Sequence, residues 1–242
     1  MSLKKRLFAA TYDRMSASTE EAGLRDRRRE LLAQAHGHVL EIGGGTGANL
    51  PFYGAAVSTL IVTEPEEAMT RRLERHVNEL TRPIELVRAS AENLPFEDGS
   101  FDFVVSTLVL CSVEDQPRAL GELRRVLKPE GQLLFIEHVR SQEDRLARWQ
   151  DRLNWLNKLV VNCECNRQTL RGIRAAGFSI AALTRGKLPK APPFARPLIV
   201  GAAVPDPASA GGTRRNSQSE HREQARARPR RRGRCAARAA GA

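Results

Sequence analysis

Residues 39–47 read Val39-Leu40-Glu41-Ile42-Gly43-Gly44-Gly45-Thr46-Gly47. A short apolar run ends in an acidic residue and then breaks into a glycine-rich turn. Glycines at positions 43, 45 and 47 remove side chains where the backbone must turn tightly and a bound molecule must approach it closely. The pattern predicts a buried strand whose carboxyl end leads into a loop that binds a nucleotide-like ligand.

The charges next to this loop bear on the choice of ligand. The spacing Gly43-x-Gly45-x-x-Ala48 also fits a looser dinucleotide pattern, so the glycines alone leave a nicotinamide cofactor and S-adenosylmethionine open. Glu41 favours S-adenosylmethionine, because a carboxylate repels a pyrophosphate but attracts the cationic α-amino group of a methionine moiety.

A second acidic residue, Glu64, follows the apolar run 59–63 and stands 23 residues after Glu41. This is close to the roughly 20-residue offset of a carboxylate that binds ribose hydroxyls. Taken alone, Glu64 also fits a surface residue or a negative charge at the start of the next helix.

Short apolar runs alternate with amphipathic stretches along the chain, which predicts an α/β fold with a parallel sheet covered on both faces. Strands are expected at His38–Ile42, Leu60–Glu64, Ile84–Arg88, Phe101–Thr107, Gln132–His138, Phe178–Thr184 and Leu198–Ala203. Helices are expected at Leu24–Ala35, Ala48–Tyr53, Glu66–Leu80, Gln116–Val126 and Arg167–Ala176, with another through Trp149 and Trp155.

Several further segments resemble those of a known protein family. They are Ala89–Phe96 with Asp98–Asp102, Leu127–Gly131, Thr107–Val113, Ile136–Val139 and the pattern Cys163-x-x-Asn166-Arg167. Together with the glycine loop, they resemble the class I S-adenosylmethionine-dependent methyltransferases from about Tyr12 to Val204. Within that family the order of segments is similar to the thiol S-methyltransferases and their small bacterial relatives. The resemblance implies a Rossmann-like, seven-stranded, mostly parallel sheet whose last strand is antiparallel.

The resemblance also implies a set of residues that bind S-adenosylmethionine. They are Glu41, Gly43, Gly45, Gly47, Glu64, Ser90, Ala91 and Thr107, with Tyr12 as a lid. Many relatives carry Asp at position 90, where it contacts the adenine amino group, so Ser90 or the backbone at Ala91 would have to substitute. Packing of Tyr12 on a helix surface, with no ligand contact, is an equally good interpretation.

The acceptor is expected to be small and rather apolar. Methyltransferases of nucleic-acid amines carry an Asn/Asp-Pro-Pro-aromatic tetrapeptide after the fourth strand, and this chain has Ser106-Thr107-Leu108-Val109 there. A thiol acceptor is favoured, with a quinone precursor or a phospholipid as the alternative methylated at carbon or nitrogen. A noncatalytic nucleotide-binding module is the alternative of a different class.

His138 is the candidate catalytic base, because it follows the fifth predicted strand at the ligand edge of the sheet. A thiol with a pKa near ~8.5 needs modest help from a base to become the thiolate nucleophile. A structural, hydrogen-bonding role is the alternative for this histidine.

The resemblance, together with the amphipathic start of the chain and the change in composition near its end, implies a helical cover at residues 1–36, a methyltransferase domain at 37–205 and a disordered tail at 206–242. From Ala208 onward there are ten Arg, two Glu and no Ile, Leu, Val or Phe, so this segment carries +8 of the net +11 and leaves +3 elsewhere. Such a tail could contact anionic surfaces or nucleic acid, and an idle extension is the favoured alternative.

No apolar run approaches the ~18 residues of a membrane span, and the amino-terminal apolar stretch is too short for a secretory signal. We therefore expect a cytoplasmic protein with reduced thiols. Cys163-x-Cys165 has no matching second pair among the four cysteines, so no metal site is expected.

Overall fold

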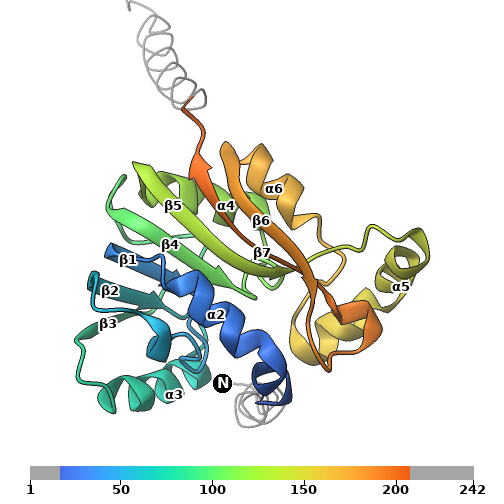
Figure 1. Ribbon diagram of the computed structural model, residues 1–242, viewed down its shortest axis with the longest axis horizontal. Helices are drawn as coiled ribbons and strands as arrows, with labels where there is room; N and C mark the ends of the chain where they lie inside the picture. Colours follow the sequence, from blue (N-terminus) through green and yellow to red (C-terminus); the bar gives the residue numbers. More distant parts are fainter. Residues whose placement is uncertain (1–16, 208–242) are drawn as a thin grey trace, which may run out of the picture. The chain divides into compact units, whose positions relative to one another are not determined.

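The computed structural model describes residues 17–207, apart from the side chains at 160 and 161. Tyr12 and nearly all of the predicted tail lie outside these residues. Seven strands form one sheet in the order β3-β2-β1-β4-β5-β7-β6 (Figure 1). Their bounds are β1 Gly37–Ile42, β2 Val57–Thr63, β3 Ile84–Val87, β4 Phe101–Thr107, β5 Leu127–His138, β6 Phe178–Lys187 and β7 Pro197–Pro205.

The first five strands pair in parallel, and β7 is antiparallel to both β5 and β6. This confirms the predicted mostly parallel sheet with an antiparallel last strand. In a parallel sheet the carboxyl ends of the strands meet at one edge, where ligands bind in open α/β folds. The ends of β1, β2, β4 and β5 therefore place Glu41, Glu64, Thr107 and His138 along the same edge of the sheet.

Helices cover both faces. The helical elements are η1 Glu20–Leu24, α2 Arg25–Leu32, η2 Leu50–Phe52, α3 Glu67–Asn78, α4 Gln116–Val126, α5 Asp144–Val161, α6 Thr169–Ala175 and η3 Pro193–Ala195. Val39 belongs to the hydrophobic cluster that includes Leu32 of α2 and Leu73 of α3, whereas Leu40 belongs to the cluster that includes Leu120 of α4. Successive side chains of a strand point to opposite faces, which explains the two clusters. Figure 1 shows α2 and α4 on opposite sides of the sheet.

One predicted helix is wrong. Residues 48–53 form turns and the short 3-10 helix η2 instead of an α-helix. Pro51 lacks the N–H that an α-helix would direct to the carbonyl of Gly47, and the backbone uses tighter bonds, from Leu50 to Gly47 and from Phe52 to Asn49.

Other elements differ at their ends. β2 begins at Val57 instead of Leu60, β5 begins at Leu127 instead of Gln132, and α6 begins at Thr169 instead of Arg167. Strand pairing extends both strands beyond the apolar runs that marked them in the sequence. None of the helices in the described part of the chain is long and apolar enough to cross a bilayer.

Candidate active site

The glycine loop after β1 is held by the carboxylate of Glu64. The backbone N–H of Gly45 donates to Oε2 of Glu64 at 2.9 Å, and the N–H of Glu66 donates to Oε1 at 2.9 Å. Burial raises the pKa of Glu64, and these two backbone bonds oppose the shift. Each carboxylate oxygen keeps a second lone pair with which it can accept a hydroxyl from a ligand.

The loop leaves room for a ligand beside one glycine in particular. Gly45 has φ +58°, and a Cβ added there would meet nothing nearer than the carbonyl oxygen of Gly43 at 4.0 Å. At Gly43 an added Cβ would come within 2.7 Å of the Val109 side chain, and at Gly47 within 2.9 Å of Leu50. The glycines at 43 and 47 therefore make space for protein side chains, while the face of Gly45 remains open to a bound molecule.

Glu41 ends in a buried set of hydrogen bonds. Nδ2 of Asn49 donates to its Oε1 at 3.0 Å, and the hydroxyl of Tyr53 donates to its Oε2 at 2.7 Å. Burial raises the pKa of Glu41 to about 7, against the opposing effect of the bonds from Tyr53 and Asn49. A buried carboxyl group with a strongly raised pKa is a candidate for a functional site.

Arg28 of α2 reaches this set from the amino-terminal helices. Its Nη1 donates to Oδ1 of Asn49 at 2.7 Å and to Oγ1 of Thr107 at 2.8 Å, and Glu20 pairs with its Nη2 at 3.0 Å. Nδ2 of Asn49 also donates to Thr107 at 2.9 Å. We call Glu41, Asn49, Tyr53, Arg28 and Thr107 the carboxylate network.

The structure thus brings Glu41 and Thr107 together, and Glu64 together with Gly45. Ser90 and Ala91 lie in the turn after β3 and share none of these hydrogen bonds within residues 17–207; Ala91 packs in a hydrophobic cluster and the carbonyl of Ser90 accepts from Asn93. Their role toward adenine stays a prediction, as does the lid role of Tyr12, which lies outside the described residues.

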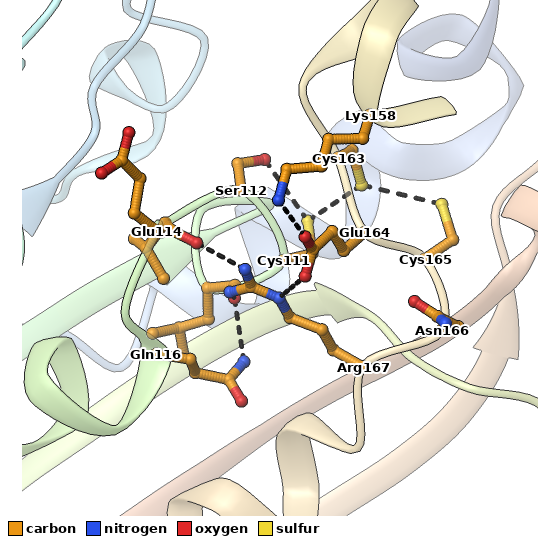
Figure 2. A network of polar contacts seen from close by, with 12 residues as sticks. Cys111, Ser112, Glu114, Gln116, Lys158, Cys163, Glu164, Cys165, Asn166 and Arg167 are labelled. Carbon is orange, nitrogen blue, oxygen red and sulfur yellow. Dashed lines mark hydrogen bonds and ion pairs between the residues drawn. The ribbon is translucent and has the colours of Figure 1, made fainter. Parts of the chain in front are cut away.

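His138 lies among cysteines. Its Nδ1 is 3.7 Å from Sγ of Cys111 and 3.4 Å from Sγ of Cys163, and Cys163 donates to Cys111 at 3.3 Å. Figure 2 shows Cys163 between Cys111 and Cys165. The sulfur of Cys165 lies 3.6 Å from that of Cys163. Burial lowers the pKa of His138, but the contact with the Cys111 thiol outweighs it and raises the pKa to about 9. We call Cys111, His138, Cys163 and Cys165 the sulfur cluster.

The role of His138 as a catalytic base stays a prediction. Its Nε2 is buried and finds no hydrogen-bond partner among the described residues. The nitrogen that does have neighbours faces cysteines of the protein itself.

Glu137, which precedes this histidine, was missed by reasoning from the sequence. Its Oε1 accepts from the Ser106 hydroxyl at 2.7 Å and from two backbone N–H groups of the loop after β4, at Val109 and Leu110. Its Oε2 accepts from the N–H of Cys111 at 3.2 Å. Burial raises the pKa of Glu137 to about 8. This carboxyl group therefore fixes the loop that carries Cys111.

Reasoning from the sequence missed four residues of these networks for a shared reason. They are Asn49, Tyr53, Arg28 and Glu137. Each acquires its role from a partner on another element, and three of them look ordinary in the sequence. Asn49 alone carried a local signal, because an amide two residues after Gly47 is well placed to contact the carboxyl end of β1.

These residues fit S-adenosylmethionine. Glu41 would provide a carboxylate for its ammonium group, Glu64 would provide acceptors for ribose hydroxyls, and the open face of Gly45 would admit a ligand close to the backbone. The fit rests on the position of the two carboxylates near the carboxyl ends of neighbouring parallel strands, β1 and β2.

Comparisons with known proteins agree with this geometry. Residues 40–135 match the methyltransferase domain family. The chain is 36% identical over 173 residues to thiol S-methyltransferase TMT1A of Homo sapiens, covering 69% of this chain and 70% of that protein. It is 29% identical over 160 residues to phosphatidylethanolamine N-methyltransferase of Cereibacter sphaeroides, covering 63% and 78%.

Among solved structures, the fold is similar to an S-adenosylmethionine-dependent methyltransferase of Thermotoga maritima, described as a possible histamine N-methyltransferase. The TM-score is 0.63, with 24% identity and coverage of 85% of this chain and 100% of that one. The sheet, the paired carboxylates and the similarity over more than two thirds of a thiol methyltransferase lead to one assignment. The chain belongs to the class I S-adenosylmethionine-dependent methyltransferases, and S-adenosylmethionine is its cofactor.

Proposed function

We propose that this enzyme transfers the methyl group of S-adenosylmethionine to a small, apolar thiol. The observation that carries the choice of a thiol is the 36% identity to a thiol S-methyltransferase over 69% of this chain. A thiol makes a modest demand on the protein, because its pKa near ~8.5 leaves a few per cent as the nucleophilic thiolate at neutral pH.

The described residues have distinct tasks in this proposal. The cofactor supplies a methyl carbon that is already activated by a sulfonium, so the protein chiefly orients the reactants and keeps water out. Glu41 binds the ammonium group of the cofactor, Glu64 binds the ribose hydroxyls, and the backbone of the glycine loop lies against the bound molecule. Ser90 and Ala91 contact the adenine.

Arg28 and Thr107 hold Glu41 in place indirectly, through Asn49. The guanidinium of Arg28 holds the side chains of Asn49 and Thr107, and Asn49 in turn holds Glu41. A chain of buried hydrogen bonds of this kind fixes the carboxylate before the cofactor arrives, which lowers the cost of ordering it on binding.

A second candidate acceptor is an aminophospholipid, favoured by one surface of α5. This helix exposes four large apolar side chains, namely Trp149, Trp155, Leu156 and Leu159. The same helix carries the basic residues Arg145, Arg148, Arg152 and Lys158. Exposed tryptophan and leucine next to basic side chains are typical of helices that lie in the interface of a lipid bilayer.

An acceptor panel tests the proposal. Full-length protein and S-adenosylmethionine are mixed with an alkyl thiol, a quinone precursor or vesicles that contain phosphatidylethanolamine, and release of S-adenosylhomocysteine is measured. We expect release with the thiol and none above background with the other two. The matched control is Glu41→Gln, which should abolish most of the release at subsaturating cofactor.

Two results would contradict the thiol. Release with the vesicles and none with any thiol would assign the aminophospholipid, and a double substitution of Trp149 and Trp155 by Ala should then reduce that activity. Release with the quinone precursor alone would assign methylation of a quinone precursor instead.

A further inference from the structure

The sulfur cluster joins three separate parts of the chain. Cys111 follows β4, His138 ends β5, and Cys163 and Cys165 lie in the connection between α5 and α6. One ligand atom from each of Cys111, His138 and Cys163 lies within 4.8 Å of the other two. The sulfur of Cys165 adds a fourth soft donor atom 3.6 Å from Cys163. Three donor atoms from three segments converge, with Cys165 beside one of them, although the proposed cofactor site uses none of the four.

The segments that carry these residues are fastened together. Arg167 donates from Nη1 to the carbonyl of Leu110 at 2.9 Å and from Nη2 to that of Val113 at 2.5 Å. The N–H of Glu164 donates to the carbonyl of Cys111 at 2.8 Å, and the carboxylate of Glu164 pairs with Arg167 (Figure 2). The loop that carries Cys111 is therefore bound directly to the segment that carries the other two cysteines.

A second layer of amides orients Cys163 and Cys165. Asn157 of α5 donates from Nδ2 to the carbonyl of Cys163 at 2.6 Å and to the sulfur of Cys165 at 3.1 Å. The buried Gln150, also of α5, donates to the carbonyl of Cys165 at 2.9 Å. Groups that hold the ligating side chains in place are a regular part of metal sites.

The distances among Cys111, His138 and Cys163 fit three corners of a tetrahedral zinc site. Zinc lies about 2.3 Å from a cysteine sulfur and about 2.0–2.1 Å from a histidine nitrogen, which places tetrahedral ligand atoms roughly 3.5–3.8 Å apart. The three contacts among Cys111, His138 and Cys163 are 3.3, 3.4 and 3.7 Å, and the sulfur of Cys165 lies 3.6 Å from that of Cys163. Thiolates with one imidazole are the donor set that zinc prefers, and the three cysteines are at most 6% exposed, as in closed structural sites.

We propose that Cys111, His138, Cys163 and Cys165 bind a zinc ion at the carboxyl edge of the sheet. Each coordinating thiol releases its proton to solvent, and Nδ1 of His138 coordinates as the neutral imidazole. The spacing Cys163-x-Cys165 looked incomplete in the sequence, and the fold supplies the missing pair as Cys111 and His138. The ion joins β4, β5 and the α5–α6 connection. This inference is independent of the identity of the methyl acceptor.

The test begins with the unmodified full-length protein. It is purified under reducing conditions from medium with added zinc, and its metal content is measured by mass spectrometry. We expect about one zinc ion per chain. Replacement by Co²⁺ should give the visible absorption bands of tetrahedral cobalt, together with thiolate-to-cobalt charge transfer. Both readouts are independent of methyltransferase activity.

Three variants sharpen the result. Asn157→Ala should lower zinc affinity by about 10- to 100-fold through the loss of orientation, and Cys163→Ser, which removes a ligand, should lower it by at least as much. Cys235→Ser is the matched control, because it removes a cysteine that lies outside the described residues, and it should retain the full zinc content. Melting temperature in chelator, with and without added zinc, shows whether each variant is folded.

The proposal is overturned if the reduced, folded protein contains no zinc and gives no cobalt bands. It is equally overturned if zinc content is the same in Cys163→Ser as in the unmodified chain. A disulfide between Cys111 and Cys163, formed in the metal-free protein and accompanied by no zinc binding after reduction, would assign the cluster to redox chemistry instead.

Discussion

The carboxylate network and the sulfur cluster lie along the same edge of one sheet, yet they are built in different ways. The carboxylate network lies beside a glycine loop with an open face at Gly45. In the sulfur cluster the donor atoms face one another, and the sulfurs are buried. The first arrangement is suited to a ligand that enters and leaves, and the second to an ion that stays.

One residue links the two regions. Val109 belongs to the loop after β4, where Glu137 accepts its backbone N–H at 3.1 Å, and its side chain occupies the space next to Gly43. The loop that positions Cys111 therefore also supports the glycine loop. Substitutions that separate cofactor affinity from stability show how independent the two regions are.

The largest effect is expected at Glu41. Glu41→Gln keeps the shape of the side chain but removes the charge that we propose binds the cofactor ammonium. A hydrogen bond to a charged group contributes about 1.5–3 kcal/mol, so cofactor affinity should fall by roughly 10- to 100-fold. Titration calorimetry measures the change, with the exposed Glu74→Gln of α3 as the control. Equal affinity in both variants would remove Glu41 from the cofactor site.

Glu137 gives the corresponding experiment for the other region. Glu137→Gln replaces one acceptor oxygen by a donor amide, so at least one backbone N–H of the loop after β4 loses its partner. A buried donor left unsatisfied costs about 1–3 kcal/mol of folding stability. Urea unfolding should show this loss. A variant as stable as the unmodified protein would mean that the loop does not depend on this carboxyl group.

Two neighbouring glycines should separate stability from binding. In Gly44→Ala the new Cβ would lie 2.3 Å from the Val62 side chain, and such overpacking costs about 1–3 kcal/mol of stability. In Gly45→Ala the new methyl group meets open space, so it causes no clash, and the stability cost is limited to the about 1–2 kcal/mol of a left-handed backbone at alanine. Cofactor affinity should fall, because the methyl group would occupy the face that we propose lies against the ligand. Thermal unfolding and calorimetry on both variants give the comparison. Unchanged affinity in Gly45→Ala would place the cofactor elsewhere.

The smallest effect is a pH dependence of cofactor affinity. The pKa of Glu41 is raised to about 7, so below that pH the carboxyl group must release a proton before it can bind an ammonium. Affinity should therefore be constant above pH 7 and fall toward tenfold per pH unit below it. Calorimetry between pH 5.5 and about 8.5 tests this, and Glu41→Gln should show a flat profile if the slope arises from Glu41.

The stability of the cofactor-free protein should move in the opposite direction. A carboxyl group whose folded pKa exceeds its unfolded value of 4.5 contributes fully below pH 4.5, and the contribution is lost as pH rises through the folded pKa of about 7. Melting temperatures over the same range, compared with Glu41→Gln, check the sign.

The sequence by itself determined the sheet and predicted the outline of the cofactor site. The apolar runs that form β1, β2 and β4 are local patterns that can be read from the sequence. A glycine loop after a strand is also a local pattern, because it indicates a tight turn that a ligand can approach closely. Glu41 and Glu64 were predicted as cofactor residues because each stands at the end of such a run, whereas Thr107 was predicted from the resemblance. The helix predicted at residues 48–53 was wrong because one proline outweighed a short periodic pattern.

What the sequence did not reveal depends on contacts between distant residues. In the sequence, Arg28 is one of several basic residues of an Arg-rich helix. The fold places its Nη1 2.8 Å from Oγ1 of Thr107, which is 79 positions away. Cys111 and Cys163 are 52 positions apart, and their sulfurs become neighbours because parallel strands end at one edge while the α5–α6 connection folds back onto it. Spacing along a chain carries no information about such pairs, so the tertiary structure alone decided them.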